Sequence, residues 1–118
     1  MLYTNLKHIE SAAEHQHIIN DNENVMVCCG RMGPMCVPVY GIMEELEGEY
    51  KHVKFYDMEF DNPEAAVIRN APECAGFMGL PFVMYYKNGK VAKATSSIQS
   101  MSQVRDILDK EFISVVKA

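Results

Sequence analysis

Three of the four cysteines lie in the stretch CCGRMGPMC, which runs from Cys28 to Cys36. Clustered thiols can exchange disulfides, bind a soft metal ion or fill a core. Gly30, Gly33 and Pro34 interrupt the stretch, so the loop can fold back and bring Cys29 near Cys36. This C-x6-C spacing predicts a redox pair.

Cys36 is expected at the start of a helix. Pro38 either occupies the first helical position or kinks a helix that starts at Pro34. In both cases the sulfur lies close to unpaired backbone N–H groups and the positive end of the helix dipole, which favour a thiolate. Arg31 adds positive charge. The alternative for Cys36 is a small apolar residue on the inner face of the helix.

Cys28 and Cys29 end a continuous apolar run, Val25–Cys29, that is typical of a buried strand. Adjacent strand residues point to opposite faces, so only one of them can face the helix that follows. We expect Cys29 to do so and Cys28 to fill the core. Cys74 is expected at the surface, either without a role or as a reserve resolving thiol.

The other elements alternate between helical and strand patterns. Helices are expected at 5–19, 37–50, from Asp61 to about Asn70, and at 102–116, and strands near 2–4 and at 25–29, 52–60, 82–86 and 91–97. Asn88-Gly89 predicts a hairpin between the last two strands. The first half implies a parallel sheet covered by helices, and the hairpin adds antiparallel strands. Sites in such sheets lie beyond the carboxyl ends of the strands, where CCGRMGPMC is expected.

Size and charge narrow the class of protein. With 118 residues the chain is expected to form a single domain, 1–118. Its net charge of −5 argues against nucleic acid or an anionic membrane as partner. No apolar run is long enough to span a bilayer, and the N-terminus does not read as a signal peptide, so we expect a cytoplasmic protein.

Gly79-Leu80-Pro81 precedes the strand FVMYY, and a proline at a strand entrance can be cis. Met35, Met32 and Met78 flank the same region. Exposed methionines make an adaptable apolar rim for a partner polypeptide, although ordinary packing explains them equally well.

The combination resembles the thioredoxin family over nearly the whole chain. ENVMVCC resembles its central strand, GPMCVPVYGIMEELEGEY its active-site helix, VKFYDMEFDNPEAAVIRN its next strand and helix, and GFMGLPFVMYYKNGKVAKATSSIQSMSQVRDILDKEF its cis-proline strand, hairpin and closing helix. The resemblance implies a thioredoxin-like α/β fold: a central mixed sheet of four to five strands flanked by four helices. It also implies that Pro81, with Gly79, Leu80 and Met35, helps hold an extended substrate segment.

The resemblance breaks at the redox motif W-C-G-P-C. Aligned without gaps, the family's first cysteine falls on Gly33 and its second on Cys36, while the tryptophan falls on Met32. The family's buried acid falls on Val27, and the threonine after the cis-proline on Phe82. The ordinary dithiol mechanism therefore does not transfer to this chain.

We expect a thiol–disulfide oxidoreductase in cell redox homeostasis that uses Cys36 with Cys29, with disulfide-containing protein substrates and a thioredoxin-reductase-like electron donor. The alternative is a redox-inactive binding module that uses the Pro81 groove. A third reading, a soft-metal or iron–sulfur site, has cysteine spacing that matches no common ligand pattern. His15 and His17 do not face one another on a helix, and no dinucleotide or phosphate loop is present, so no metal or cofactor is expected.

Overall fold

The computed structural model describes residues 2–113. Its elements follow in the order β1 (Lys7–Ile9), α1 (Ala12–Asp21), β2 (Asn24–Gly30), α2 (Val37–Glu47), β3 (Lys54–Glu59), η1 (Pro63–Ala65), α3 (Ala66–Arg69), η2 (Pro72–Cys74), β4 (Phe82–Lys87), β5 (Lys90–Ser96) and α4 (Met101–Glu111). The elements alternate between strand and helix as far as β3, and a hairpin then joins β4 to β5, as expected. No helix within this range is long and apolar enough to cross a membrane.

The strands form one mixed sheet in the order β1-β3-β2-β4-β5. β3 runs parallel to both β1 and β2, whereas β4 runs antiparallel to β2 and to β5. The central strand β2 is buried along its whole length, because its neighbours pair with both edges and helices cover both faces. The expected fold class, a mixed sheet of up to five strands flanked by four helices, is confirmed.

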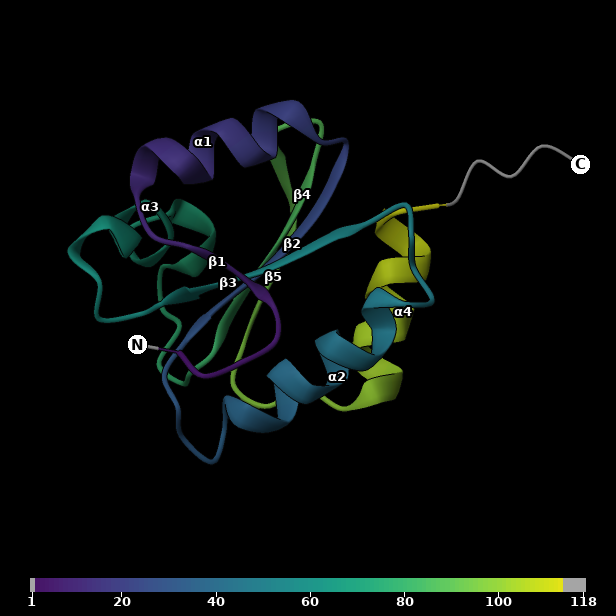
Figure 1. Cartoon of the computed structure of the whole chain (residues 1–118). Helices are drawn as coiled ribbons and strands as arrows, with labels where there is room; N and C mark the ends of the chain where they lie inside the picture. The colour runs from purple at the N-terminus through teal and green to yellow at the C-terminus, as the bar shows by residue number, and fades with distance from the viewer. Residues whose placement is uncertain (1, 114–118) are drawn as a thin grey trace, which may run out of the picture.

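The sheet separates two apolar clusters. On one face, α2 and α4 pack against β2 and β4, and Met43, Tyr85 and Leu108 lie in this cluster. On the other face, α1 and α3 pack against the same strands, and Ile19, Met58 and Ile68 lie in that cluster. Figure 1 shows the two pairs of helices on opposite sides of the sheet. We call these the α2 face and the α1 face.

The first thirty residues differ from the expected arrangement. The expected helix at 5–19 is wrong at its start, because Lys7–Ile9 forms the edge strand β1 instead, paired with Tyr56–Met58. The weak strand expected near 2–4 therefore lies several residues later. Ser11 caps α1, where its hydroxyl accepts a hydrogen bond from the Glu14 N–H, and this fixes the helix start after β1. The last helix, expected at 102–116, is present at Met101–Glu111 and ends earlier than expected, because Phe112 is its C-cap and Ile113 is not helical. Residues 114–116 lie outside the described residues.

Candidate functional site

Cys36 lies at the beginning of α2, as expected. It is the N-cap residue of the helix, which begins at Val37, as expected from the pattern over 37–50. Pro38 is therefore the second helical residue and not the first, and the alternative start at Pro34 is wrong. The preceding turn is closed by hydrogen bonds from the Cys36 and Val37 N–H groups to the Gly33 carbonyl. The Arg31 N–H donates to the Cys36 sulfur at 3.4 Å. One backbone donor, the Arg31 N–H, is therefore directed at the sulfur, while the Cys36 and Val37 N–H groups are bound by the Gly33 carbonyl.

Gly30, the last residue of β2, lies directly beside this sulfur. A Cβ atom placed on Gly30 would lie 2.8 Å from Cys36 Sγ, 2.8 Å from the Tyr40 hydroxyl and 3.2 Å from Pro81 Cβ. These three side chains therefore meet around one small space that only glycine leaves open. Cys36 and Pro81 are brought together, as the sequence predicts.

The Leu80–Pro81 peptide bond is cis, as expected. The loop before it is held by the end of β5, because the Ser97 N–H donates to the Gly79 carbonyl at 3.2 Å and to the Pro81 carbonyl at 3.1 Å. Gly79 and Leu80 are half-buried and Pro81 is buried. The predicted substrate-binding loop thus has a fixed backbone next to Cys36.

The two adjacent cysteines of β2 lie on the faces opposite to those expected. Cys28 belongs to the cluster of the α2 face together with Cys36, whereas Cys29 belongs to the cluster of the α1 face. The expectation that Cys29 faces the helix carrying Cys36 is therefore wrong. Strand alternation separates the pair as predicted, but its phase is set by the whole strand, whose Val27 also lies on the α1 face.

Cys74 is buried rather than exposed, and this expectation is also wrong. It ends the short turn η2 and contacts Met84, with 3.5 Å between the two sulfur atoms. It lies on the α1 face with Cys29, so the sheet separates it from Cys36. All four thiols are free in this structure.

Burial dominates the electrostatics of these thiols. Desolvation raises the pKa of Cys29 to about 12 and raises the pKa of Cys28 well above its usual value. The pKa of Cys36 is also raised by burial, while the hydrogen bond from the Arg31 N–H and the positive charge of Arg31 lower it in part. The N-terminus of α2 therefore does not make Cys36 a ready thiolate, in contrast to the expectation from its position.

Exposed apolar side chains surround the turn that covers Cys36. Met32 and Met35 are 41% and 42% exposed, Val37 is 44% exposed and Met78 is 96% exposed. A groove of about 480 Å³ begins at Met32 and Val37 and continues between α2 and the N-terminal segment. The methionine rim expected from the sequence is present on the surface.

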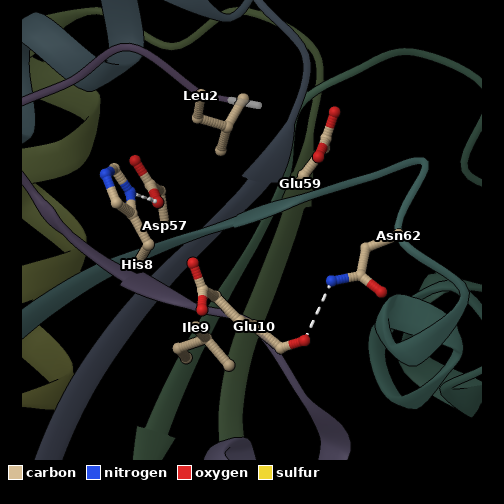
Figure 2. Close-up of a pocket in the computed structure, with 7 residues that line it drawn as sticks. All are labelled: Leu2, His8, Ile9, Glu10, Asp57, Glu59 and Asn62. Carbon is tan, nitrogen blue, oxygen red and sulfur yellow. Dashed lines mark hydrogen bonds and ion pairs between the residues drawn. The ribbon is translucent and has the colours of Figure 1, made fainter.

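A second polar site lies beside β1, and the sequence analysis missed it (Figure 2). The carboxylate of Asp57 is fully buried and accepts hydrogen bonds from the Thr4 hydroxyl and from Nδ1 of His8. Burial raises the pKa of Asp57, and these two hydrogen bonds lower it in part. A cavity of about 170 Å³ opens next to this pair. The sequence signal for this site was Asp57 itself, a charged residue at a strand position that the pattern predicts to be buried.

The part of the chain that the structure describes contains no group of three or more His, Cys, Asp or Glu side chains arranged to hold a metal ion. Cys28 and Cys29 contribute to different faces of the sheet, so the four thiols do not converge.

Comparison with known proteins identifies the fold. No protein-family profile and no curated protein matches the sequence. Among solved structures, a thioredoxin from Plasmodium falciparum is 25% identical with a TM-score of 0.73, and the match covers 89% of this chain and 98% of that one. Thioredoxin f2 from Chlamydomonas reinhardtii is 12% identical with a TM-score of 0.75 over 92% of this chain and 98% of that one. A mutant thioredoxin from Halobacterium salinarum is 14% identical with a TM-score of 0.75 over 99% and 100%. The chain has the thioredoxin-family fold.

Proposed function

We propose that the chain is a thioredoxin-like thiol–disulfide oxidoreductase in which Cys36 is the exchanging thiol. The observation that carries the proposal is the position of Cys36 Sγ, which accepts a hydrogen bond from the Arg31 N–H and faces cis-Pro81 across Gly30. The solved thioredoxins that share its fold support a redox function of the same general kind. The substrates proposed are disulfide-containing proteins, with a thioredoxin-reductase-like electron donor and a cytoplasmic location.

The exchange runs through a mixed disulfide. The Cys36 thiolate attacks one sulfur of a substrate disulfide, so that a new S–S bond forms and the other substrate sulfur leaves as a thiolate. A second thiolate then attacks the mixed disulfide, which releases the reduced substrate. Electrons reach the substrate from the two thiols, which end as a disulfide.

The mechanism also requires a second thiol that attacks the mixed disulfide. Cys29 was expected to serve, but it lies on the α1 face. We propose Cys28 in its place, since Cys28 and Cys36 share the α2 face and burial raises the pKa of Cys28 with a further contribution from the Cys36 sulfur. Oxidation of Cys28→Ser and Cys29→Ser by a small disulfide distinguishes the two pairings: the disulfide to Cys36, detected by peptide mass spectrometry, should be lost in Cys28→Ser and kept in Cys29→Ser.

Access limits the rate. Cys36 is only 2% exposed. A protein disulfide reaches its sulfur only when the surrounding structure opens, so turnover is expected to be slower than that of an exposed thiol with a lowered pKa.

The direct test is reduction of a model protein disulfide with dithiothreitol as the electron source. The parent protein should accelerate the reaction, and Cys36→Ser should lose the acceleration. Cys74→Ser is the matched control, because Cys74 is also a buried thiol but lies across the sheet. Equal rates for the parent and Cys36→Ser would rule out the proposed reaction.

A second function, a redox-inactive binding module, is favoured by a specific observation. Cys36 is sealed and Gly33 replaces a cysteine, whereas Met32, Met35 and Met78 are exposed around the Pro81 loop. In that case the rim contacts an extended apolar segment of a partner protein and the thiols only pack. Binding of such a partner that persists after replacement of both Cys29 and Cys36 would support the module.

A further inference from the structure

The hydroxyl of Tyr40 is a polar group that the reaction proposed so far does not use. Tyr40 lies on α2 and is 2% exposed. Within residues 2–113, its hydroxyl is one of three buried side-chain polar atoms without a hydrogen-bond partner, together with the hydroxyls of Tyr85 and Thr95. A buried, unpaired hydroxyl costs about 1–3 kcal/mol in a typical protein. This cost suggests that the Tyr40 hydroxyl does more than pack in the core.

Tyr40 and Cys36 are one helical turn apart, and the Tyr40 N–H donates to the Cys36 carbonyl at 3.1 Å. Their side chains therefore project from the same face of α2. The Tyr40 hydroxyl and Cys36 Sγ are each 2.8 Å from the position of a Cβ atom built on Gly30. The oxygen and the sulfur consequently border the same small space, and their separation is at most twice that distance.

The space has a donor but no strong acceptor while Cys36 is protonated, because a neutral thiol accepts hydrogen bonds weakly. The acceptor strength of the sulfur rises sharply when it becomes an anion. Burial holds the pKa of Tyr40 far above its usual range, so the phenol keeps its proton at neutral pH. The titratable groups that act on the Tyr40 hydroxyl are Cys36 on the same helix, Cys28 and Cys29 on β2, and Asp57 on β3. The Asp57 carboxyl already accepts hydrogen bonds from Thr4 and His8.

We propose that Tyr40 is a positioning residue for thiol exchange, whose phenolic O–H donates a hydrogen bond to the anionic sulfur of Cys36. The inference rests on the proposed role of Cys36 as the exchanging thiol. In the first step of that exchange, the Cys36 thiol gives its proton to water, and the phenol stabilises the anionic sulfur that results. The Cys36 thiolate then attacks one sulfur of the substrate disulfide, so the S–S bond to Cys36 forms while the substrate S–S bond breaks and its electron pair leaves on the other substrate sulfur. No proton is transferred from the phenol.

Gly30 leaves open the space between the Tyr40 hydroxyl and the Cys36 sulfur. Any larger residue at this position would place its Cβ at 2.8 Å from both atoms and would push them apart. The combination of Gly30 and Tyr40 therefore forms a donor pocket that neither residue forms alone.

The test is the pH dependence of Cys36 alkylation by iodoacetamide, followed by peptide mass spectrometry in the parent and in Tyr40→Phe. The substitution removes only the oxygen. We expect the alkylation profile to move to higher pH and the rate at pH 7.5 to fall about 3- to 10-fold, as loss of one hydrogen bond to a thiolate implies. Thermal unfolding of Tyr40→Phe should match or exceed that of the parent, since an unpaired buried hydroxyl is removed.

Tyr85→Phe is the matched control. Its hydroxyl is also buried and unpaired on the α2 face, but Tyr85 lies on β4 and its oxygen is not among the atoms around Gly30. This variant should leave the Cys36 profile unchanged. If Cys36 is reactive and the profiles of the parent and Tyr40→Phe coincide, the role of Tyr40 is wrong while the proposed function stands. If Cys36 is inert in the parent, the proposed function fails, and the role of Tyr40 fails with it.

Discussion

The two faces of the sheet each contain two buried cysteines. Among these four, and counting only the described residues, Cys36 on the α2 face alone has a sulfur that accepts a hydrogen bond from a backbone N–H. On the α2 face, Cys36 lies at a helix start with the Arg31 N–H as donor and the Tyr40 hydroxyl nearby. On the α1 face, Cys29 and Cys74 pack among aliphatic and aromatic side chains, and Cys74 contacts the Met84 sulfur. The two faces therefore differ in the hydrogen-bond donors beside a thiol, not in the burial of their thiols.

The sharpest expected difference between the faces is in the rate of thiol labelling under native conditions. Cys29 is fully buried and its pKa is raised to about 12, so a small alkylating reagent should reach it only in molecules that unfold globally. Its labelling should be at least about 10³-fold slower than in the urea-unfolded chain. Cys36 should react faster, through opening of the turn before α2. Equal labelling rates for the two cysteines, measured by peptide mass spectrometry, would remove the distinction between the faces.

A second cysteine at position 33 should strengthen the α2 face further. A Cβ atom on Gly33 meets no atom within 4 Å, so Gly33→Cys fits without strain and forms Cys-x-x-Cys with Cys36. We expect disulfide reductase activity to rise about 10- to 100-fold, because an intramolecular thiol resolves the mixed disulfide. Gly48→Cys is the matched control, since a Cβ at that position meets no atom closer than 4.0 Å and Gly48 is at the opposite end of α2 from Cys36. A similar gain in both variants would show that an added surface thiol is sufficient.

The buried carboxyl on the α2 face should appear in the pH dependence of stability. Asp57 pairs in register with Cys28, and burial raises its pKa from the usual 3.8. The folded state therefore binds the proton more tightly, and ionisation of Asp57 lowers the free energy of unfolding as the pH rises from about 3.8 through the raised pKa. In Asp57→Asn this loss should disappear, so the variant should gain stability relative to the parent as the pH rises.

Urea unfolding at a series of pH values measures this difference for Asp57. The exposed carboxyl of Glu45, also on α2, provides the control variant Glu45→Gln. A difference between Asp57→Asn and the parent that stays constant with pH would contradict the raised pKa.

The smallest effect concerns the charge of Arg31, which is exposed and forms a bidentate ion pair with Asp61. Its charge lowers the pKa of Cys36 against the larger effect of burial. Arg31→Gln should slow Cys36 alkylation about twofold at low salt, and 1 M salt should abolish the difference because it screens exposed charges. Asp61→Asn removes the ion pair but leaves the positive charge of Arg31 in place, so this variant should not slow the alkylation of Cys36. A salt-independent loss in Arg31→Gln would point to a change in the turn instead.

Sequence patterns were sufficient for most of the fold and for half of the candidate site. The apolar strand 25–29, the Asn88-Gly89 hairpin and the proline before Phe82 are local signals, and the structure has each feature where it was expected. The face of Cys29 was not predictable from the last two strand residues, because the packing of the whole of β2 sets the phase of alternation. The burial of Cys74 depends on Met84, ten residues away, and no local pattern contains that contact.

The edge strand β1 was missed for a similar reason. Lys7–Ile9 has only three residues and is a strand because β3 pairs with it, whereas its apolar spacing continues into α1. Tyr40 was missed because an aromatic residue on a helix normally packs as core, and the missing partner of its hydroxyl is visible only once Gly30 and Cys36 are placed beside it.

The methionine rim has a consequence for oxidative damage. Met78 is almost fully exposed, and Met32 and Met35 present about two fifths of their surface, while all four cysteines are enclosed. A diffusing peroxide meets these thioethers before it meets any thiol, and their sulfoxides are polar where the rim was apolar. Oxidative stress would therefore alter the methionine rim before the thiols, and a methionine sulfoxide reductase would be needed to restore it.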